Sequence, residues 1–222
     1  MRLPTNETNR GKVLIVDTDD EARLQLRTLL RGEGYVAEMF TWAGALLDAA
    51  LPEAPCCIIA EAQMPAIDGL ELIERLKLRG DPIPVILVTD HADVPLTVRA
   101  IKAGAVDFLP RPFDDMDLLG AIEHALEIDM QRRSAARSRY AIGQRFDTLT
   151  PRERQVMGGV VRGLMNKQIA WELGISEITV KLHRSSMMRK LDLRSVPDLV
   201  RASQILPAQS GPTSIGCGVP TH

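Results

Sequence analysis

The stretch Ser176–Leu191, SEITVKLHRSSMMRKL, has the pattern of a helix with one packed face and one basic face. At about 100° per residue, one stripe gathers the side chains that we expect to pack: Val180, His183, Met187 and Leu191. The opposite face is polar and basic apart from one leucine: Lys181, Leu182, Ser185 and Arg189. Ser176 is a suitable N-cap residue. The stretch therefore predicts a helix that packs on a small core and turns a basic face outward.

The residues around this helix predict three more short helices. Asn166–Leu173 ends at Gly174, and a turn of three residues leads to Ser176. Thr150–Glu153, TPRE, combines an N-cap Thr, a first-turn Pro and a Glu that completes a capping box, and SVPD at 195–198 has a similar form. We expect helices over 150–162, 166–173, 177–191 and 196–204, the middle two forming a helix-turn-helix. The alternative is an ordinary surface helix with a solvated charged face.

The charge of the chain is divided unevenly along its 222 residues, a length that suggests two domains. Residues 1–127 carry 12 Lys and Arg against 22 Asp and Glu, a net charge of −10, whereas residues 128–222 carry 15 against 7, a net charge of +8. This asymmetry suggests that only the second half meets a polyanion. Because the sequence has neither a long apolar run nor a secretion signal, we expect a cytoplasmic protein without membrane contact.

Residues 12–127 alternate short apolar runs with amphipathic stretches. Helices are predicted at about 20–32, 42–50, 67–79, 94–103 and from 114 onward. Strands are predicted at Lys12–Val16, Tyr35–Met39, Cys56–Ala60, Val85–Thr89 and Val106–Leu109. The runs VLIV, CIIA and VILV indicate strands that are buried on both faces. We therefore expect an α/β fold, a doubly wound five-stranded parallel sheet, with its site at the carboxyl ends of the strands.

The remaining segments give weaker signals. The last helix of the first half has no strong breaker up to Tyr140, so we expect a helical linker over 128–146, broken at Gly143, whose Arg-rich end is either solvated or near DNA. Adjacent Cys56 and Cys57 should point to opposite faces of the sheet and remain unpaired. Trp42 and Trp171 are expected to pack. The tail at 205–222, which contains Cys217, is rich in Pro, Gly and Ser and is expected to be disordered.

The stretch LTPRERQVMGGVVRGLMNKQIAWELGISEITVKLHRSSMMRKL, residues 149–191, resembles the LuxR-type helix-turn-helix of NarL/FixJ response regulators. QMPAIDGLEL, VTDHADVPLTVRAIKAGA and GAVDFLPRPF resemble the receiver domains of the same family. The resemblance implies a flavodoxin-like receiver over 11–127 and a four-helix DNA-binding domain over 147–204. It further implies a transcription regulator, not an enzyme, with promoter DNA, a sensor kinase and a second copy as partners. The copies would pair through residues 94–103 and 106–111.

The family's receiver uses five site residues, and three of those positions differ here. Asp17 matches the first of two Mg²⁺-binding acids and Thr89 matches the hydroxyl residue, while Phe108 matches the switch aromatic. The second acid is replaced by Thr18, the phosphoacceptor Asp by Glu61, and the Lys before Pro by Arg111.

Phosphoryl transfer depends on positioning and charge stabilisation, so these differences should disable it. The Arg111 guanidinium could pair with Glu61 or with Asp17, and Glu61 could stand as a phosphomimic facing Thr89. We hypothesise a receiver in a fixed state with no cofactor. The alternative is a conventional phosphorylation switch in which Asp19 replaces the missing acid and Asp17, Asp19 and Glu61 retain weak Mg²⁺ binding.

On the recognition helix, the outward side chains Lys181, Leu182, Ser185 and Arg189 should read base edges in the major groove. Four flanking residues should meet phosphates: Thr179 and Arg184, and Asn166 and Lys167 at the start of the preceding helix.

Two other functions fit parts of the sequence. VDTDDE at 16–21 matches the Asp-x-Asp pattern of haloacid-dehalogenase-type phosphatases, with Asp17 as nucleophile and Asp19 as general acid. No cap insertion, suitable Lys or late acidic pair accompanies it, and the helix-turn-helix would be unexplained. The last alternative is an adaptor whose receiver-like domain binds another receiver or a small ligand, and no sequence feature specifically supports it.

Overall fold

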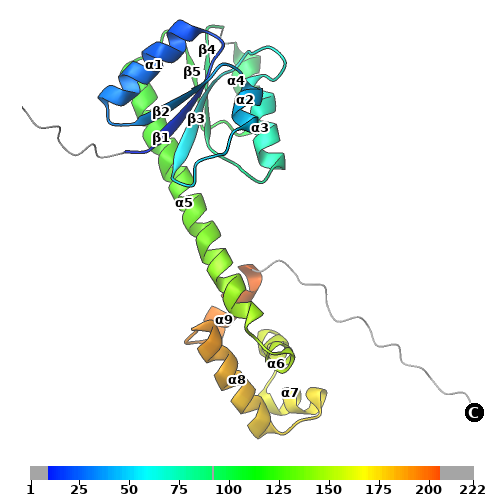
Figure 1. The fold of residues 1–222 in the computed structure, drawn as a ribbon. Coiled ribbons are helices and arrows are strands. Elements are labelled where there is room, and N and C mark those ends of the chain that lie inside the picture. The colour runs from blue at the N-terminus through cyan, green and yellow to red at the C-terminus, as the bar shows by residue number, and fades with distance from the viewer. Residues whose placement is uncertain (1–9, 92, 206–222) are drawn as a thin grey trace, which may run out of the picture. The chain divides into compact units, whose positions relative to one another are not determined.

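The computed structural model describes residues 10–91 and 93–205, which form two compact units that meet in the sequence between Ser134 and Ala135. The first unit contains a five-stranded parallel sheet in the order β2-β1-β3-β4-β5 (Figure 1). Its strands are β1 Lys12–Val16, β2 Val36–Phe40, β3 Cys56–Glu61, β4 Val85–Thr89 and β5 Asp107–Pro110. The doubly wound sheet predicted from the apolar runs is confirmed, although β2 and β5 each lie one residue later than expected.

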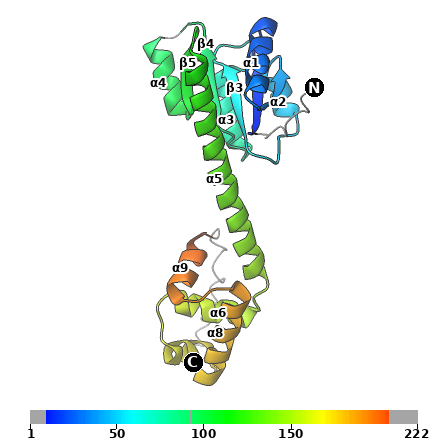
Figure 2. The ribbon, with the colours of Figure 1, turned by 90° about the vertical axis from the view of Figure 1, so that its left-hand side faces the viewer.

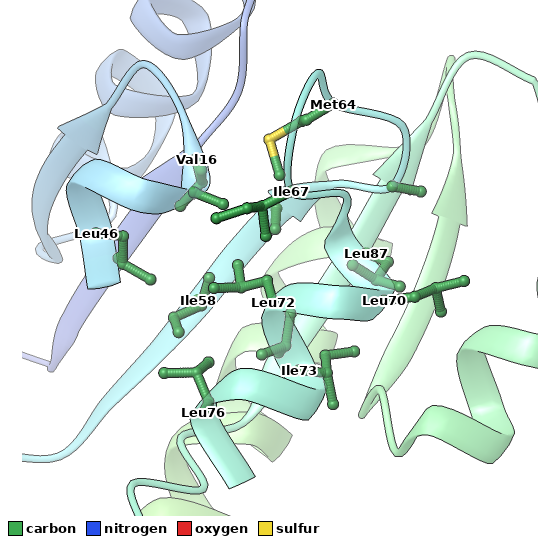
Figure 3. Packing of buried hydrophobic residues seen from close by; sticks show 14 of the residues in the cluster. Val16, Leu46, Ile58, Met64, Ile67, Leu70, Leu72, Ile73, Leu76 and Leu87 are labelled. Atoms are coloured by element: carbon green, nitrogen blue, oxygen red, sulfur yellow. The ribbon is translucent and has the colours of Figure 1, made fainter. Parts of the chain in front are cut away.

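Helices cover both faces of this sheet, as Figure 2 shows. They are α1 Asp20–Gly32, α2 Ala43–Asp48, α3 Gly69–Leu78, α4 Val94–Ala103 and α5 Asp115–Asp147. Leu14 and Val16 of β1 belong to the core under α2, α3 and α4, in which Figure 3 labels Val16. Val13 and Ile15 belong to the core under α1 and α5. Side chains alternate along a strand, so each apolar run supplies both cores at once.

The two adjacent cysteines of β3 point into different cores, as predicted. Cys56 belongs to the core under α2–α4 and Cys57 to the core under α1 and α5. Both are free thiols, and burial raises the pKa of each. They are therefore held protonated. The tail expected over 205–222, with Cys217, lies from residue 206 onward outside the described residues.

A buried group of charges, here called the Asp129 network, joins α5 to the amino end of β3. Asp129 is fully buried, and its Oδ2 accepts from the Cys56 backbone N–H at 2.9 Å and from Arg133 Nε at 2.6 Å. Arg132 Nη2 donates to Oδ1 at 2.6 Å. Arg133 also donates to the carbonyl oxygens of Glu53 and Pro52 at 2.8 and 2.9 Å. Two arginines of the expected linker therefore belong to the first unit.

The second unit is a bundle of short helices on a separate core. It holds the end of α5 together with α6 Pro151–Val161, α7 Asn166–Leu173, α8 Glu177–Leu191 and α9 Val196–Ile205. The predicted break at Gly143 is wrong, because α5 continues to Asp147. Phe146 is buried in this core, and Ile142 packs against it. Their burial outweighs the cost of one helical glycine, about 1 kcal/mol.

The local signals that bound the helix-turn-helix are confirmed. The turn after α7 uses Gly174 in the left-handed conformation at φ 64°, which glycine adopts at little cost. The Ser176 hydroxyl accepts from the Thr179 N–H at 3.1 Å and so caps α8. Both bonds of the capping box between Thr150 and Glu153 are present, at 3.2 and 2.8 Å.

Trp171 does not pack as expected, because it is 86% exposed on α7. Trp42 is 45% exposed, but its ring packs over Gly44 of α2, where an added Cβ would lie 1.8 Å from it. Among the described residues, no helix is both long and apolar enough to cross a membrane.

Candidate functional site

Four polar residues lie at the carboxyl ends of neighbouring strands in the first unit. Asp17 follows β1, Glu61 and Thr89 end β3 and β4, and Arg111 follows β5. Because these strands are parallel and adjacent, their ends meet at one edge of the sheet. Asp17 is 1% exposed and Thr89 is buried as well, so the edge holds ionisable and hydroxyl groups away from water.

Arg111 forms an ion pair with buried Asp17. Its Nη2 lies 2.6 Å from Asp17 Oδ2, and the Asp19 N–H donates to the other oxygen, Oδ1, at 2.9 Å. Arg111 Nη1 also lies 3.8 Å from Asp90. Of the two Arg111 pairings expected from the sequence, the structure contains the one with Asp17. Both Asp17 oxygens therefore have protein donors, as a buried carboxylate requires.

Glu61 contacts Thr18 instead of Arg111 or Thr89. Its Oε2 accepts from the Thr18 hydroxyl at 2.8 Å and from the Thr18 N–H at 3.3 Å. The Thr89 hydroxyl accepts from the His91 N–H at 3.2 Å. Within the described residues, Glu61 therefore makes neither the expected bond to Arg111 nor the expected contact with Thr89. The Glu61 side chain reaches Thr18, so two of the three positions that differ from the family pattern bond to each other.

These residues do not fit a Mg²⁺ site. The ion requires near-octahedral oxygen ligands, and proteins usually supply one or two carboxylates that are free to bind it. Asp17 is paired with a guanidinium, and Asp19 Oδ1 caps α1 by accepting from the Glu21 N–H at 2.8 Å. Across residues 10–91 and 93–205, no three His, Cys, Asp or Glu side chains are grouped so that they could hold a metal.

Phe108, the expected switch aromatic, is half-buried against the α2–α4 core.

In the second unit, α8 turns the expected basic face toward solvent. The outward residues are all exposed, with Leu182 at 65%: Lys181, Leu182, Ser185 and Arg189. Val180, Met187 and Leu191 on the other face are buried, whereas His183 is only half-buried. Lys167 is exposed beside this face, and Thr179 is half-buried.

Two of the residues expected at phosphates are bonded to each other. Arg184 Nη1 of α8 donates to Asn166 Oδ1 at the start of α7, at 3.0 Å. This bond ties the recognition helix to the helix before it. It leaves the remaining N–H groups of the Arg184 guanidinium for another acceptor.

Sequence reasoning missed Arg194 and Ser195, which lie at the start of α9. They line a hollow of about 400 Å³ together with Asn166, Lys181 and Arg184. The hollow is lined by three cationic side chains and no carboxylate, so it suits an anionic group such as a phosphate. The sequence shows Arg194 directly before the helix start SVPD, but its position beside Lys181 depends on the fold.

The buried carboxylate of Glu153 links α6 to the recognition helix α8. Its Oε2 lies 2.7 Å from Lys190 Nζ of α8, and it also accepts from the Thr150 N–H at 2.8 Å. Burial opposes the charge on Glu153, but hydrogen bonds from Lys190, Thr150 and Ser186 outweigh it and lower the pKa to about 2.

The Glu153 pKa makes the stability of the second unit depend on pH. Because the folded pKa lies below the ordinary value of 4.5, the stabilisation is complete above about pH 4.5 and is lost as pH falls toward 2. We expect Glu153→Gln to lower the stability of the second unit at neutral pH by about 1–3 kcal/mol and to flatten this dependence. Circular dichroism of thermal unfolding at several pH values measures it. Glu172→Gln, an exposed acid on α7, is the control, and equal pH slopes for all three proteins would contradict the assignment.

Comparison with known proteins matches both units to described families. Residues 13–123 match the response regulator receiver domain, and residues 147–203 match the bacterial regulatory proteins of the luxR family. Nodulation protein W of Bradyrhizobium diazoefficiens is 41% identical over 202 residues, covering 91% of this chain and 89% of that protein. The transcriptional regulatory protein FixJ of the same organism is also 41% identical, over 87% of this chain and 95% of its own length.

Solved structures agree with these matches. The response regulator StyR superposes with a TM-score of 0.75 at 45% identity, over 87% of this chain and 98% of that one. Full-length FixJ from B. japonicum gives a TM-score of 0.55 at 38% identity, over 89% and 98%. The resemblance read from the sequence is therefore confirmed along almost the whole chain. The chain belongs to the NarL/FixJ family of two-component response regulators, with a receiver domain followed by a LuxR-type DNA-binding helix-turn-helix.

Proposed function

We propose that this response regulator binds promoter DNA in the cytoplasm without needing phosphorylation of its receiver. The observation that carries the proposal is the ion pair between Arg111 and buried Asp17. A receiver that accepts a phosphoryl group needs Asp17 for Mg²⁺, and here a fixed positive charge lies 2.6 Å from that carboxylate. The pair supplies internally the positive charge that Mg²⁺ would bring.

The Glu61–Thr18 contact supports the same proposal. The family's phosphoacceptor is an aspartate, and Glu61 places its carboxylate one methylene farther along the side chain. That carboxylate is occupied by the Thr18 hydroxyl and N–H. A displacement of about 1 Å can reduce a positioned reaction by about 10²-fold. We infer that Glu61 holds the β1 and β3 ends together instead of accepting a phosphoryl group, and that the receiver uses no cofactor.

The unmodified chain is proposed to act as a homodimer. On α4, an exposed apolar row is formed by Val94, Val98 and Ile101. Contiguous apolar surface of this kind is typical of protein interfaces. A second copy would cover this row and the neighbouring β5. The receiver implies contact with a sensor kinase, and the proposal is that such a contact would transfer no phosphoryl group.

Exposure to a small phosphodonor with Mg²⁺ should leave both the mass and the sedimentation of the chain unchanged. The positive control is the triple variant Thr18→Asp/Glu61→Asp/Arg111→Lys, which restores the family residues. Glu61→Asp alone should remain unmodified, because Arg111 would still pair with Asp17. A stable acyl phosphate on Glu61 of the unaltered chain, detected by mass spectrometry, would show instead a conventional phosphorylation switch.

The exposed face of α8 is proposed to read bases, with Lys181 and Arg189 as donors to guanine, Leu182 toward a thymine methyl and Ser185 less selective. Thr179, Arg184, Asn166 and Lys167 are proposed at phosphates, as is Arg194 from the hollow at the start of α9.

Lys181→Ala and Lys167→Ala should weaken DNA binding in different ways. Loss of Lys181 should cost about 1–3 kcal/mol on the matched site and relax specificity at one base pair. Loss of Lys167 should weaken all sequences alike and lower the salt slope by about one unit. Affinities on matched and mismatched duplexes across a salt series measure both effects. If both variants weaken binding uniformly, Lys181 is not a base-reading residue.

A further inference from the structure

We propose that the receiver binds an organic cation with an apolar body in the cavity between α1 and the segment after β5. The cavity has a volume of about 820 Å³, within the range of small-molecule sites. The proposal rests on the proposed function, because Arg111 lines the cavity and its pairing with Asp17 decides the charge there.

Half of the twelve residues that line the cavity are apolar. Leu24 and Leu29 of α1 line it together with Pro112 and Phe113, which follow Arg111. Leu24 is 49% exposed, although Leu30 of the same helix is fully buried in the core. An apolar ligand body placed against Leu24 and Phe113 would remove this surface from water, which is the main source of affinity in such sites.

The charged groups of the cavity select the sign of the ligand. Three carboxylates line it, those of Glu21, Asp90 and Asp115, and Arg111 is its only cationic lining residue among the described part of the chain. The Arg111 charge is already paired with Asp17 at 2.6 Å, whereas Asp90 lies 3.8 Å from it. The lining therefore carries uncompensated negative charge, which attracts a cation and repels an anion.

Asp90 is the carboxylate best placed to receive the cation. Its side chain is 60% exposed, and the long contact with Arg111 is its one ion pair within the described residues. A ligand ammonium at Asp90 would leave the closer Arg111–Asp17 pair intact. Because the ligand would bind the folded receiver and not the unfolded chain, saturation should raise the receiver's unfolding temperature.

The test uses the full chain and three probes that share one apolar body: phenylpropylamine, phenylpropanol and phenylpropionate. Calorimetric titration should show saturable binding of the amine, at least about tenfold tighter than the alcohol, with the carboxylate weakest. Asp90→Asn should remove about that tenfold preference for the amine while leaving the alcohol unchanged. Leu24→Lys should abolish amine binding by placing a cation in the cavity. Leu78→Lys, at an exposed leucine on α3, is the matched control and should bind as the unaltered chain does.

Equal affinity for the three probes, or amine binding that survives Leu24→Lys, would overturn the proposal. Absence of saturable amine binding by the folded, unaltered chain would overturn it as well. The phosphodonor experiment separates this result from the proposed function. A chain that binds the amine as described but is phosphorylated on Glu61 retains the cavity site and loses the proposed function, and an unmodified chain that binds no amine shows the reverse.

Discussion

Replacing Arg111 with alanine should destabilise the receiver by about 3–5 kcal/mol, the cost of leaving a buried charge without its partner. Asp17 is 1% exposed, and its Oδ2 would lose the guanidinium that lies 2.6 Å away. The remaining donor, the Asp19 N–H, bonds only the other oxygen. Urea denaturation of the full chain, followed on the receiver transition, measures this loss.

A second substitution, at Asp17, distinguishes the loss of the Arg111 charge from the loss of its side-chain packing. Asp17→Asn combined with Arg111→Ala should recover much of the stability lost in Arg111→Ala alone, because no uncompensated charge remains. Arg99→Ala removes an exposed arginine from α4 and should change the stability by less than about 0.5 kcal/mol. A double variant as unstable as Arg111→Ala would mean that Arg111 acts by packing, and the fixed state proposed for the receiver would lose its main support.

Asp129→Ala should cost the receiver a similar amount, about 3–5 kcal/mol. The substitution removes the acceptor of the Cys56 N–H and leaves Arg132 and Arg133 without their buried carboxylate. Differential scanning calorimetry should show a lower receiver transition and an unchanged transition of the DNA-binding domain, whose core is separate.

The Asp129 experiment has its control on the same helix. Arg137→Ala changes an exposed residue of α5 and should leave both transitions in place. Asp129→Asn keeps the shape of the side chain and can still accept from the Cys56 N–H. Its loss of receiver stability should therefore lie between those of Asp129→Ala and Arg137→Ala. A receiver transition that is identical in Asp129→Ala and the unaltered chain would show that the network does not stabilise α5.

Most of the fold could be predicted because short-range rules determine it. Apolar runs such as VLIV identified the buried strands, and Thr150, Ser176 and Gly174 marked helix boundaries through bonds that involve only neighbouring residues. Gly143 was misread because the burial of Phe146, a tertiary effect, overrides the low helix propensity of glycine. Trp171 was misread because an aromatic residue in an amphipathic helix usually packs, and here it faces solvent.

The site was predicted less completely than the fold. The sequence placed Asp17, Glu61 and Arg111 at one edge of the sheet, but it left two partners open for Arg111 and missed the Glu61–Thr18 contact. Which oxygen meets which donor depends on side-chain torsions that a pattern does not encode. The link from Asp129 to Cys56 spans 73 residues, so no local rule could reveal it.

The middle of α5 separates the two cores along the chain. Residues 134–141 are all exposed, and a helical segment this short is marginal when it has only its own backbone bonds. Tertiary contacts hold α5 on either side, at Asp129 and at Phe146. Substitutions, insertions and local unfolding in those eight residues are therefore tolerated by both cores. Side-chain changes at the receiver site, such as those at Glu61 and Arg111, therefore need not disturb the core of the DNA-binding domain.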